Sequence, residues 1–102
     1  MPSYRAALQI TGLRPGHDPE AVMDTATAAV SEEHLVEAKS LDVPAGVPTI
    51  TVRFLVEPSS EGEENQEAQR VSAQMQHAVA AIAHTGRLRT LRRQRGRWLL
   101  IG

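Results

Sequence analysis

The sequence predicts an α+β domain in which two helices cover one face of an antiparallel sheet. Three observations support this fold class. Several short segments alternate between apolar and polar residues, as half-buried strands do, and two longer segments repeat apolar residues at helical spacing. The segments also follow one another in the order strand, helix, strand, strand, helix, strand. The chain has 102 residues, 41% of them hydrophobic, so we expect a single domain over residues 1–102.

The first strand and the first helix are expected in the first third of the chain. Residues 4–11 alternate between apolar and polar side chains, which is typical of a strand with one buried face. After a break at residues 12–16, Asp18 is placed to cap a helix that begins at Pro19. The apolar stripe of this helix stops where Glu33 takes an apolar position, so the helix is expected to end near there.

The middle of the chain predicts two strands separated by a loop. Residues 35–43 alternate weakly, and residues 44–48 hold two prolines and a glycine, which favour a loop. The clearest alternation of the chain follows in residues 49–57, with Phe54 among the apolar positions, and Pro58 ends the strand.

A second helix is expected after an acidic loop at residues 59–65. Ser60 and Glu63 have the spacing of a capping box, and an apolar stripe continues to Ile82. We expect this stripe to pack against the apolar face of the strand at residues 49–57. Gly86 stands where a C-cap glycine would end the helix.

The histidines do not form a metal site by this interpretation. His77 and His84 both fall on the second helix, where seven residues correspond to about 10 Å along the axis. They are therefore too far apart to share one ion. His34 lies near the end of the first helix between Glu33 and Glu37, where a capping or surface role is expected.

The C-terminal segment reads as one or two strands, residues 87–93 and 97–101, joined by a turn at residues 94–96. The order βαββαβ, with an extra C-terminal strand, resembles the ferredoxin-like, or split βαβ, arrangement. This resemblance implies two helices on one face of the sheet and leaves the other face uncovered. The fold hosts many functions and implies none of them.

Charge is distributed unevenly along the chain. Residues 1–85 hold all 12 acids and only five of the 11 bases, whereas residues 86–102 hold six arginines and no acid. These arginines and the nearby tryptophan are candidate contacts for an anion or a nucleic acid: Arg87, Arg89, Arg92, Arg93, Arg95, Arg97 and Trp98. The alternative is that the cluster protects an edge strand from aggregation or pairs with the acids at residues 61–67.

The leading interpretation is a small non-enzymatic binding or assembly module. We expect it to be a homodimer that associates through its open sheet face or its C-terminal edge strand, since the small core leaves little buried area. The candidate dimer face consists of outward positions on two strands: Ala7, Gln9, Thr51, Arg53 and Leu55. Nucleic-acid binding through the arginine cluster is the first alternative. It ranks below self-association because the chain has few aromatic residues for stacking on bases, and because residues 1–85 carry a net negative charge that opposes a polyanion.

An enzymatic or small-molecule site between the sheet faces of a dimer is the second alternative, with Arg14, His17 or Arg53 as its polar groups. No nucleophile motif occurs in the sequence. The absence of cysteine excludes disulfides, thiolate metal sites and thiol catalysis. We therefore expect no cofactor and no catalytic residue. No segment approaches the ~18 apolar residues of a membrane span, so we expect a cytoplasmic protein without membrane contact.

Overall fold

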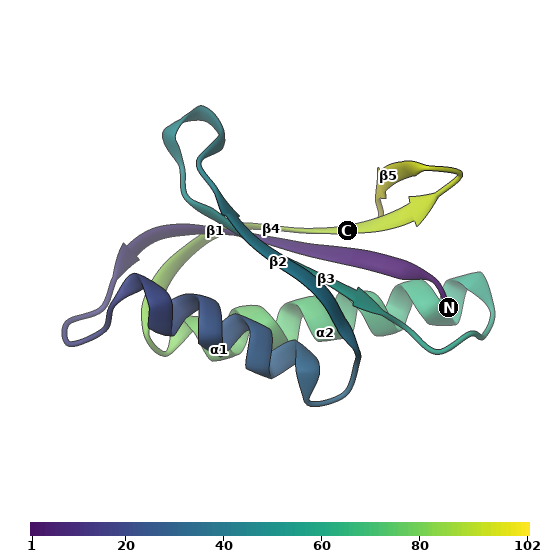
Figure 1. Cartoon of the computed structure of the whole chain (residues 1–102), viewed down its shortest axis with the longest axis horizontal. Coiled ribbons are helices and arrows are strands. Elements are labelled where there is room, and N and C mark those ends of the chain that lie inside the picture. The colour runs from purple at the N-terminus through teal and green to yellow at the C-terminus, as the bar shows by residue number, and fades with distance from the viewer.

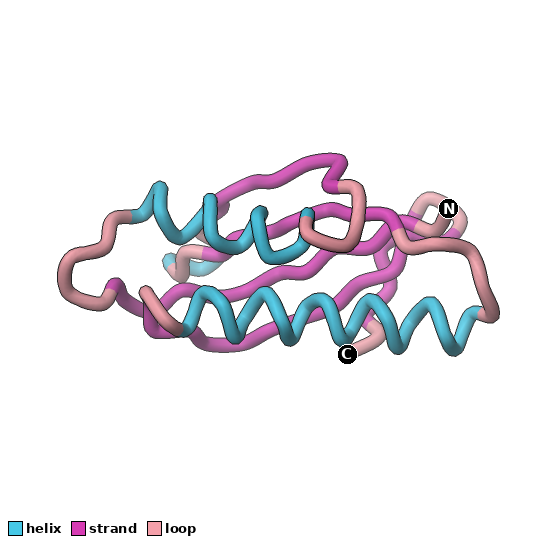
Figure 2. Tube along the Cα trace, turned by 90° about the horizontal axis from the view of Figure 1, so that it is seen from below, coloured by secondary structure: helices cyan, strands magenta, loops and turns pink.

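The predicted α+β architecture is present in the computed structural model, which describes residues 1–102. One five-stranded sheet carries two helices. The elements follow in chain order: β1 (Ser3–Leu13), α1 (Pro19–Ser31), β2 (Val36–Asp42), η1 (Pro44–Gly46), β3 (Thr49–Leu55), α2 (Glu61–Ala80), β4 (Ala83–Gln94) and β5 (Arg97–Leu100). Figure 1 shows both helices on one side of the sheet, and Figure 2 shows them lying along the same face.

The strands are ordered β2-β3-β1-β4-β5, and every neighbouring pair is antiparallel. This layout is compatible with the ferredoxin-like split βαβ arrangement, with β5 as an additional edge strand. Ala6 of β1 lies opposite Val52 of β3 and Thr90 of β4. Because side chains alternate along a strand, this register directs the even-numbered residues of β3, of residues 4–10 in β1 and of residues 88–92 in β4 toward the helices, and the odd-numbered ones away from them. Register shifts between the end of β1 and the start of β4 change this alternation, so odd-numbered Ala83 lies in the core.

The core lies between the helices and the sheet. It includes the apolar even-numbered residues of β1 and β3, and the stripes of both helices. Sixteen buried residues form it: Tyr4, Ala6, Leu8, Ile10, Val22, Ala26, Val30, Ile50, Val52, Phe54, Val56, Ala68, Val71, Met75, Val79 and Ala83. The expected packing of the α2 stripe directly on β3 needs correction, because α2 lies mainly over β4 and β1 while α1 contacts β3.

Both helix starts are capped as predicted. The Asp18 carboxylate accepts a hydrogen bond from the Ala21 N–H at 2.8 Å, and the Ser60 Oγ accepts one from the Glu63 N–H at 3.2 Å. The Ser60 hydroxyl also donates to the Glu63 carboxylate at 2.8 Å. These bonds satisfy donors that the first helical turn leaves free. Neither helix has the length and apolar character that crossing a membrane requires.

The expected end of the second helix is wrong. α2 ends at Ala80, and both Gly86 and His84 belong to β4. β4 begins at Ala83 because that residue pairs with Leu13 at the end of β1. Gly86 serves a close approach between strands rather than a helix cap, since a Cβ atom there would lie 2.9 Å from the Gln9 side-chain oxygen.

Candidate functional site

The sheet face opposite the helices, called here the open face, is covered by no helix. Two hairpins rise from it at opposite ends of the molecule, β2–β3 with η1 at its tip and β4–β5 (Figure 1). Two hollows lie on this face, of about 280 Å³ and about 230 Å³. The open face is therefore a concave surface bounded by the two hairpins.

Arginine dominates the open face. Arg5 of β1 and Arg53 of β3 lie directly opposite each other in the register. β4 adds three more on this side of the sheet: Arg87, Arg89 and Arg93. Like charges at directly opposed positions destabilise a sheet, so this grouping requires a compensating interaction or a partner.

Arg53 is held in place by its neighbours. Its Nε donates to the Ser3 hydroxyl at 3.0 Å and to the Glu37 carboxylate at 3.2 Å. The Ser3 hydroxyl in turn donates to the same Glu37 oxygen at 2.9 Å. Both bonds of Arg53 use Nε, which leaves its terminal nitrogens for another partner.

The other open-face arginines have no carboxylate partner. The ion pairs of the chain use Arg53, Arg70 and Arg92. Every other arginine of the open face therefore carries a charge that no acid of the chain neutralises directly. A polyanion would find these guanidinium groups available for bidentate contacts with its phosphates.

Trp98 completes the open face from β5. The centroid of its ring lies 4.1 Å from the Arg5 guanidinium carbon, 5.2 Å from that of Arg53 and 5.5 Å from that of Arg93. Trp98 thus reaches past β4 to the two central strands, which have no outward aromatic residue of their own. Cation–π contacts of this kind stabilise the cationic groups and orient the indole.

The two hollows extend this surface along the sheet. Next to the paired arginines, one hollow is lined by Arg5, Ala38, Lys39, Ser40, Asp42, Thr51 and Arg53. The other lies between β4 and the tip of the β2–β3 hairpin and is lined by Ala7, Gln9, Pro44, Ala45, Thr49, Arg87 and Arg89. Both linings combine cations with hydroxyl groups, and the second adds the Gln9 amide, which suits phosphate and sugar oxygens.

Arg92 does not belong to the open face, which corrects the prediction of one continuous arginine cluster. It points to the helix side, where its guanidinium lies 3.0 Å from the Glu64 carboxylate and hydrogen-bonds the hydroxyl of Tyr4. That hydroxyl donates to Asn65 at 2.7 Å. Burial raises the pKa of Tyr4, while the hydrogen bond from the Ser59 N–H lowers the pKa of Glu64. This network fixes α2 on the sheet.

Glu64 is a further correction. The sequence placed it in an exposed acidic loop, yet α2 begins at Glu61 and the Glu64 side chain is buried. Its carboxylate accepts a hydrogen bond from the Ser59 N–H at 2.9 Å in addition to the contact with Arg92. The alternative that the arginine cluster pairs with the acids at residues 61–67 therefore holds for Arg92, whereas the burial of the pair depends on β4 lying beside the start of α2.

The other candidate anion-contact and dimer-face residues named from the sequence lie in two parts of the structure, the tip of the β4–β5 hairpin and the open face. Arg95 and Arg97 lie at the tip of the β4–β5 hairpin, where they are exposed. The candidate dimer residues Gln9, Thr51, Arg53 and Leu55 occupy odd-numbered positions of the open face. Ala7 shares that side but is only 4% exposed, so it offers a partner little surface.

Arg14 and His17 are not brought to Arg53. Both lie in the connection between β1 and α1, and the Nε of Arg14 donates to the Ala80 carbonyl at 2.8 Å. Arg14 thereby ties this connection to the end of α2. Of the three polar groups named for the second alternative, only Arg53 therefore lies on the open face.

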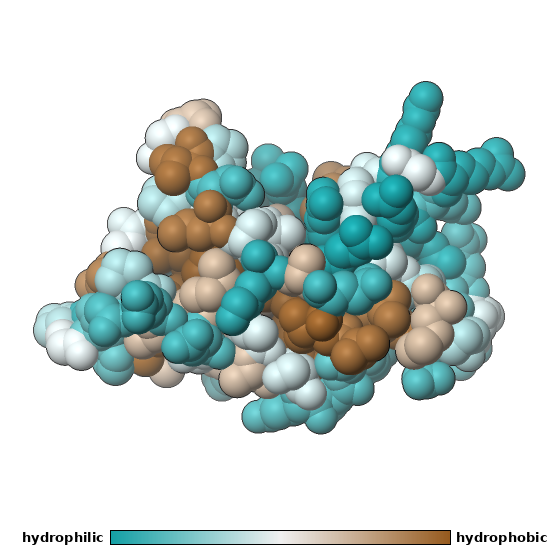
Figure 3. All heavy atoms as spheres, in the orientation of Figure 1, coloured by the Kyte–Doolittle hydropathy of each residue, from teal (hydrophilic) through white to brown (hydrophobic).

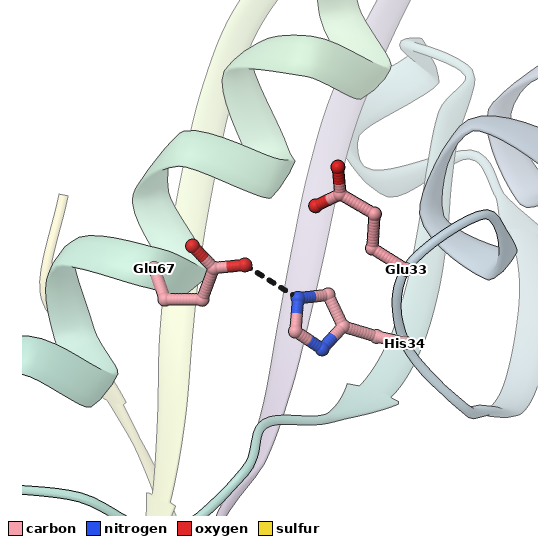
Figure 4. Close-up of side chains that lie close together, drawn as sticks. All are labelled: Glu33, His34 and Glu67. Carbon is pink, nitrogen blue, oxygen red and sulfur yellow. Dashed lines mark hydrogen bonds and ion pairs between the residues drawn. The ribbon is translucent and has the colours of Figure 1, made fainter.

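A second polar cluster joins the end of α1 to α2 (Figure 4). The Nε2 of His34 lies 2.7 Å from the Glu67 carboxylate, and Glu33 is close by, so that ligand atoms of the three residues lie within 4.8 Å of one another. Such a set could hold a divalent ion. However, Arg70 already contacts both Glu33 and Glu67 and supplies a cation to the two carboxylates.

The electrostatics of this second cluster indicate a structural role. Hydrogen bonds from Arg70 and then from His34 lower the pKa of Glu67 to about 2, and the bonds to Glu67 and Glu33 raise the pKa of Arg70. The His34 ring also packs against Phe54, with 5.9 Å between ring centroids. The predicted surface role of His34 is therefore replaced by a contact between the two helices, which no local sequence signal indicates.

Comparisons of the chain with protein-family profiles, with curated proteins and with solved structures found no significant match. The function proposed below is accordingly derived from the geometry of the open face.

Proposed function

We propose that the protein is a non-enzymatic binding module that holds single-stranded nucleic acid on the open face of its sheet. One observation carries this proposal. Arginines without a carboxylate partner surround Trp98 on the only sheet face that no helix covers. Sheet faces that bind single strands combine such cations with aromatic side chains, on which bases stack.

The chemistry of the face favours binding over catalysis. Its side chains are guanidinium, hydroxyl and amide groups, together with the carboxylates Glu37 and Asp42. Glu37 is already bonded to Ser3 and Arg53. Two serine hydroxyls donate to carboxylates there, Ser3 to Glu37 at 2.9 Å and Ser40 to Asp42 at 3.3 Å, but neither pair is joined by a third group that orients the base, as covalent catalysis would need. These groups instead match phosphate oxygens, sugar hydroxyls and base edges.

The distribution of charge over the molecule also favours binding of an anionic ligand on the open face. Most acids of the chain lie on or beside the two helices, including four within α2. The open face carries five arginines opposed by two acids. A polyanion would therefore approach the sheet side and avoid the helix side, even though the net charge of the chain is −1.

Self-association is a second candidate function, and the free edges of the sheet favour it. The outer edges of β2 and β5 pair with no strand of the chain. Two copies that met through their open faces would bring arginines against arginines, which costs free energy unless an anion lies between them. The edge strands are therefore the better contact in the absence of a ligand.

Binding of a mixed-sequence single-stranded RNA or DNA oligonucleotide, measured by filter retention across salt concentrations, tests the nucleic-acid proposal. With five arginines engaged, the logarithm of affinity should fall against the logarithm of salt with a slope of about −3.5. R89E should lower affinity by about tenfold or more. W98A should weaken binding with little change in slope, because stacking releases no counterions.

R14E is the matched control, since it changes the charge by the same amount as R89E but lies at the end of α2, away from the open face. Its affinity should stay close to that of the wild type. Binding that is absent, insensitive to salt, or equally weakened by R14E and R89E would contradict the proposal.

A further inference from the structure

An apolar groove lies where β1 and α1 meet the β2–β3 hairpin. Its volume is about 360 Å³, and most of its lining is hydrophobic. The lining residues are Ile10, Thr11, Gly12, Leu13, Pro19, Val22, Met23, Leu41, Pro48 and Ile50. Hydrophobic spheres gather over and beneath this hairpin in Figure 3. Leu41 is 52% exposed, so the chain itself does not close the groove.

Acids border this groove. Asp18 and Glu20 flank the lining residue Pro19, and Asp24 follows Met23. All three are exposed. Exposed apolar surface rimmed by charge marks an interaction site, and here the rim favours a partner that is apolar and positively charged.

The β4–β5 hairpin has this character. Arg95 and Arg97 stand at its tip, and Leu99 and Leu100 are 44% and 56% exposed. Positive φ angles of 52° at Arg95 and 76° at Gly96 form the tight turn that suits a two-residue hairpin loop. The hairpin is thus a short, well-defined element whose apolar side chains lack a partner.

Groove and hairpin lie at opposite ends of a molecule whose longest extent is 42 Å (Figure 1). The hairpin of a chain therefore does not reach the groove of the same chain. Each also lies beside a free strand edge, β5 at one end and β2 at the other. Leu41 lies opposite Ile50, and Leu99 opposite Arg92, which places both leucines on the helix side of the sheet.

We propose that the groove receives the β4–β5 hairpin of a second copy of this chain. The β5 edge of one copy pairs with the β2 edge of the next, Leu99 enters the groove beside Leu41, and the arginines of the hairpin tip meet the acidic rim. This contact develops the self-association candidate and requires no nucleic acid.

Because the two contacting surfaces differ, the association is head-to-tail rather than two-fold symmetric. Every bound copy still presents one free groove and one free hairpin, so copies add to open chains unless a ring closes. The mass in solution should therefore exceed 11.1 kDa and rise with concentration.

Complementation between two variants tests this contact. L41D disables the groove and L99D disables the hairpin, so each alone should stay monomeric in size-exclusion chromatography with light scattering. Their equimolar mixture should form a dimer and nothing larger, because it retains one intact groove and one intact hairpin. L35D is the control, since Leu35 is 65% exposed but does not line the groove; it should associate as the wild type does.

A charge exchange at exposed positions provides an independent measurement. R95E/R97E should weaken association by about tenfold or more, and mixing with E20K/D24K should restore it. A wild type that is monomeric at every concentration would overturn the proposal. A failure of L99D and L41D to complement each other, with both variants folded by circular dichroism, would also overturn it. A third contradicting result is association that L99D abolishes and L41D leaves unchanged, because that result indicates a symmetric dimer of β5 edges.

Discussion

The two faces of the sheet use arginine in opposite ways. On the helix side, Arg92 contacts Glu64 and Tyr4 and is largely buried. On the open face, its sequence neighbour Arg93 is exposed, has no carboxylate partner and lies near the Trp98 ring. A buried, bonded charge fixes structure, whereas an unpaired exposed charge adds little to stability. The difference indicates that the fold depends on one set of arginines and a partner would use the other.

The largest effect is expected from the core on the helix side. F54A should lower the free energy of unfolding by about 3–5 kcal/mol, because Phe54 is fully buried among the helices and strands. Its neighbour Leu55 faces the open side and is only half-buried, so L55A should cost much less. Chemical denaturation of both variants measures the contrast, and equal losses would show that the two faces are not distinguished as described.

Arg92 and Arg93 give the sharpest test of the comparison. R92A should cost about 2–4 kcal/mol, because Tyr4, Asn65 and Glu64 lose a common partner. R93A should change stability by less than about 0.5 kcal/mol but weaken binding of single-stranded nucleic acid. Urea unfolding and filter retention on both variants check the two halves of this prediction. A stable R92A, or an unstable R93A, would reverse the roles assigned to the two faces.

Lowering the pH should first weaken the interactions on the helix side of the sheet that stabilise the fold. The pKa of Glu67 is lowered from 4.5 to about 2 in the folded chain. Its interactions therefore stabilise the fold fully above pH 4.5, and this contribution is lost as the pH falls toward 2. Thermal melting across this window should show a falling midpoint for the wild type. E67Q should show a shallower fall, with a remainder from Glu64, whose pKa is also lowered.

The smallest effect is expected on the open face. R89Q removes one of several like charges and should raise stability by about 0.2–0.5 kcal/mol at low salt. The gain should vanish at high salt, where exposed charges are screened. Denaturation midpoints at two salt concentrations measure it. A clear loss of stability in R89Q would mean that Arg89 holds the fold, contrary to its exposed and unpaired position.

Most of the fold was predictable because its signals are local. Residues 4–11 and 49–57 alternate clearly, and the caps Asp18 and Ser60 stand at the correct spacing. The boundary between α2 and β4 was not predictable, because the sequence continues with helix-forming alanines beyond Ala80. Pairing with Leu13 starts the strand at Ala83 instead, and the sequence does not display a long-range pairing of this kind.

The candidate site was predictable only in part. The run of arginines near the C-terminus is visible in the sequence, but its division between two faces depends on the register of β4 against β1. The contribution of Arg5 and Arg53 depends on Trp98 reaching over β4. The contact between His34 and Glu67 joins residues 33 positions apart. Each of these features arises from tertiary packing rather than from residue type or spacing.

The position of Trp98 also makes the open face observable without a label. It is the only tryptophan of the chain, so all indole emission comes from this one place, next to three guanidinium groups. Any ligand that displaces those groups or stacks on the ring must change the intensity or wavelength of that emission. The intrinsic fluorescence of the unmodified protein therefore reports the occupancy of the open face.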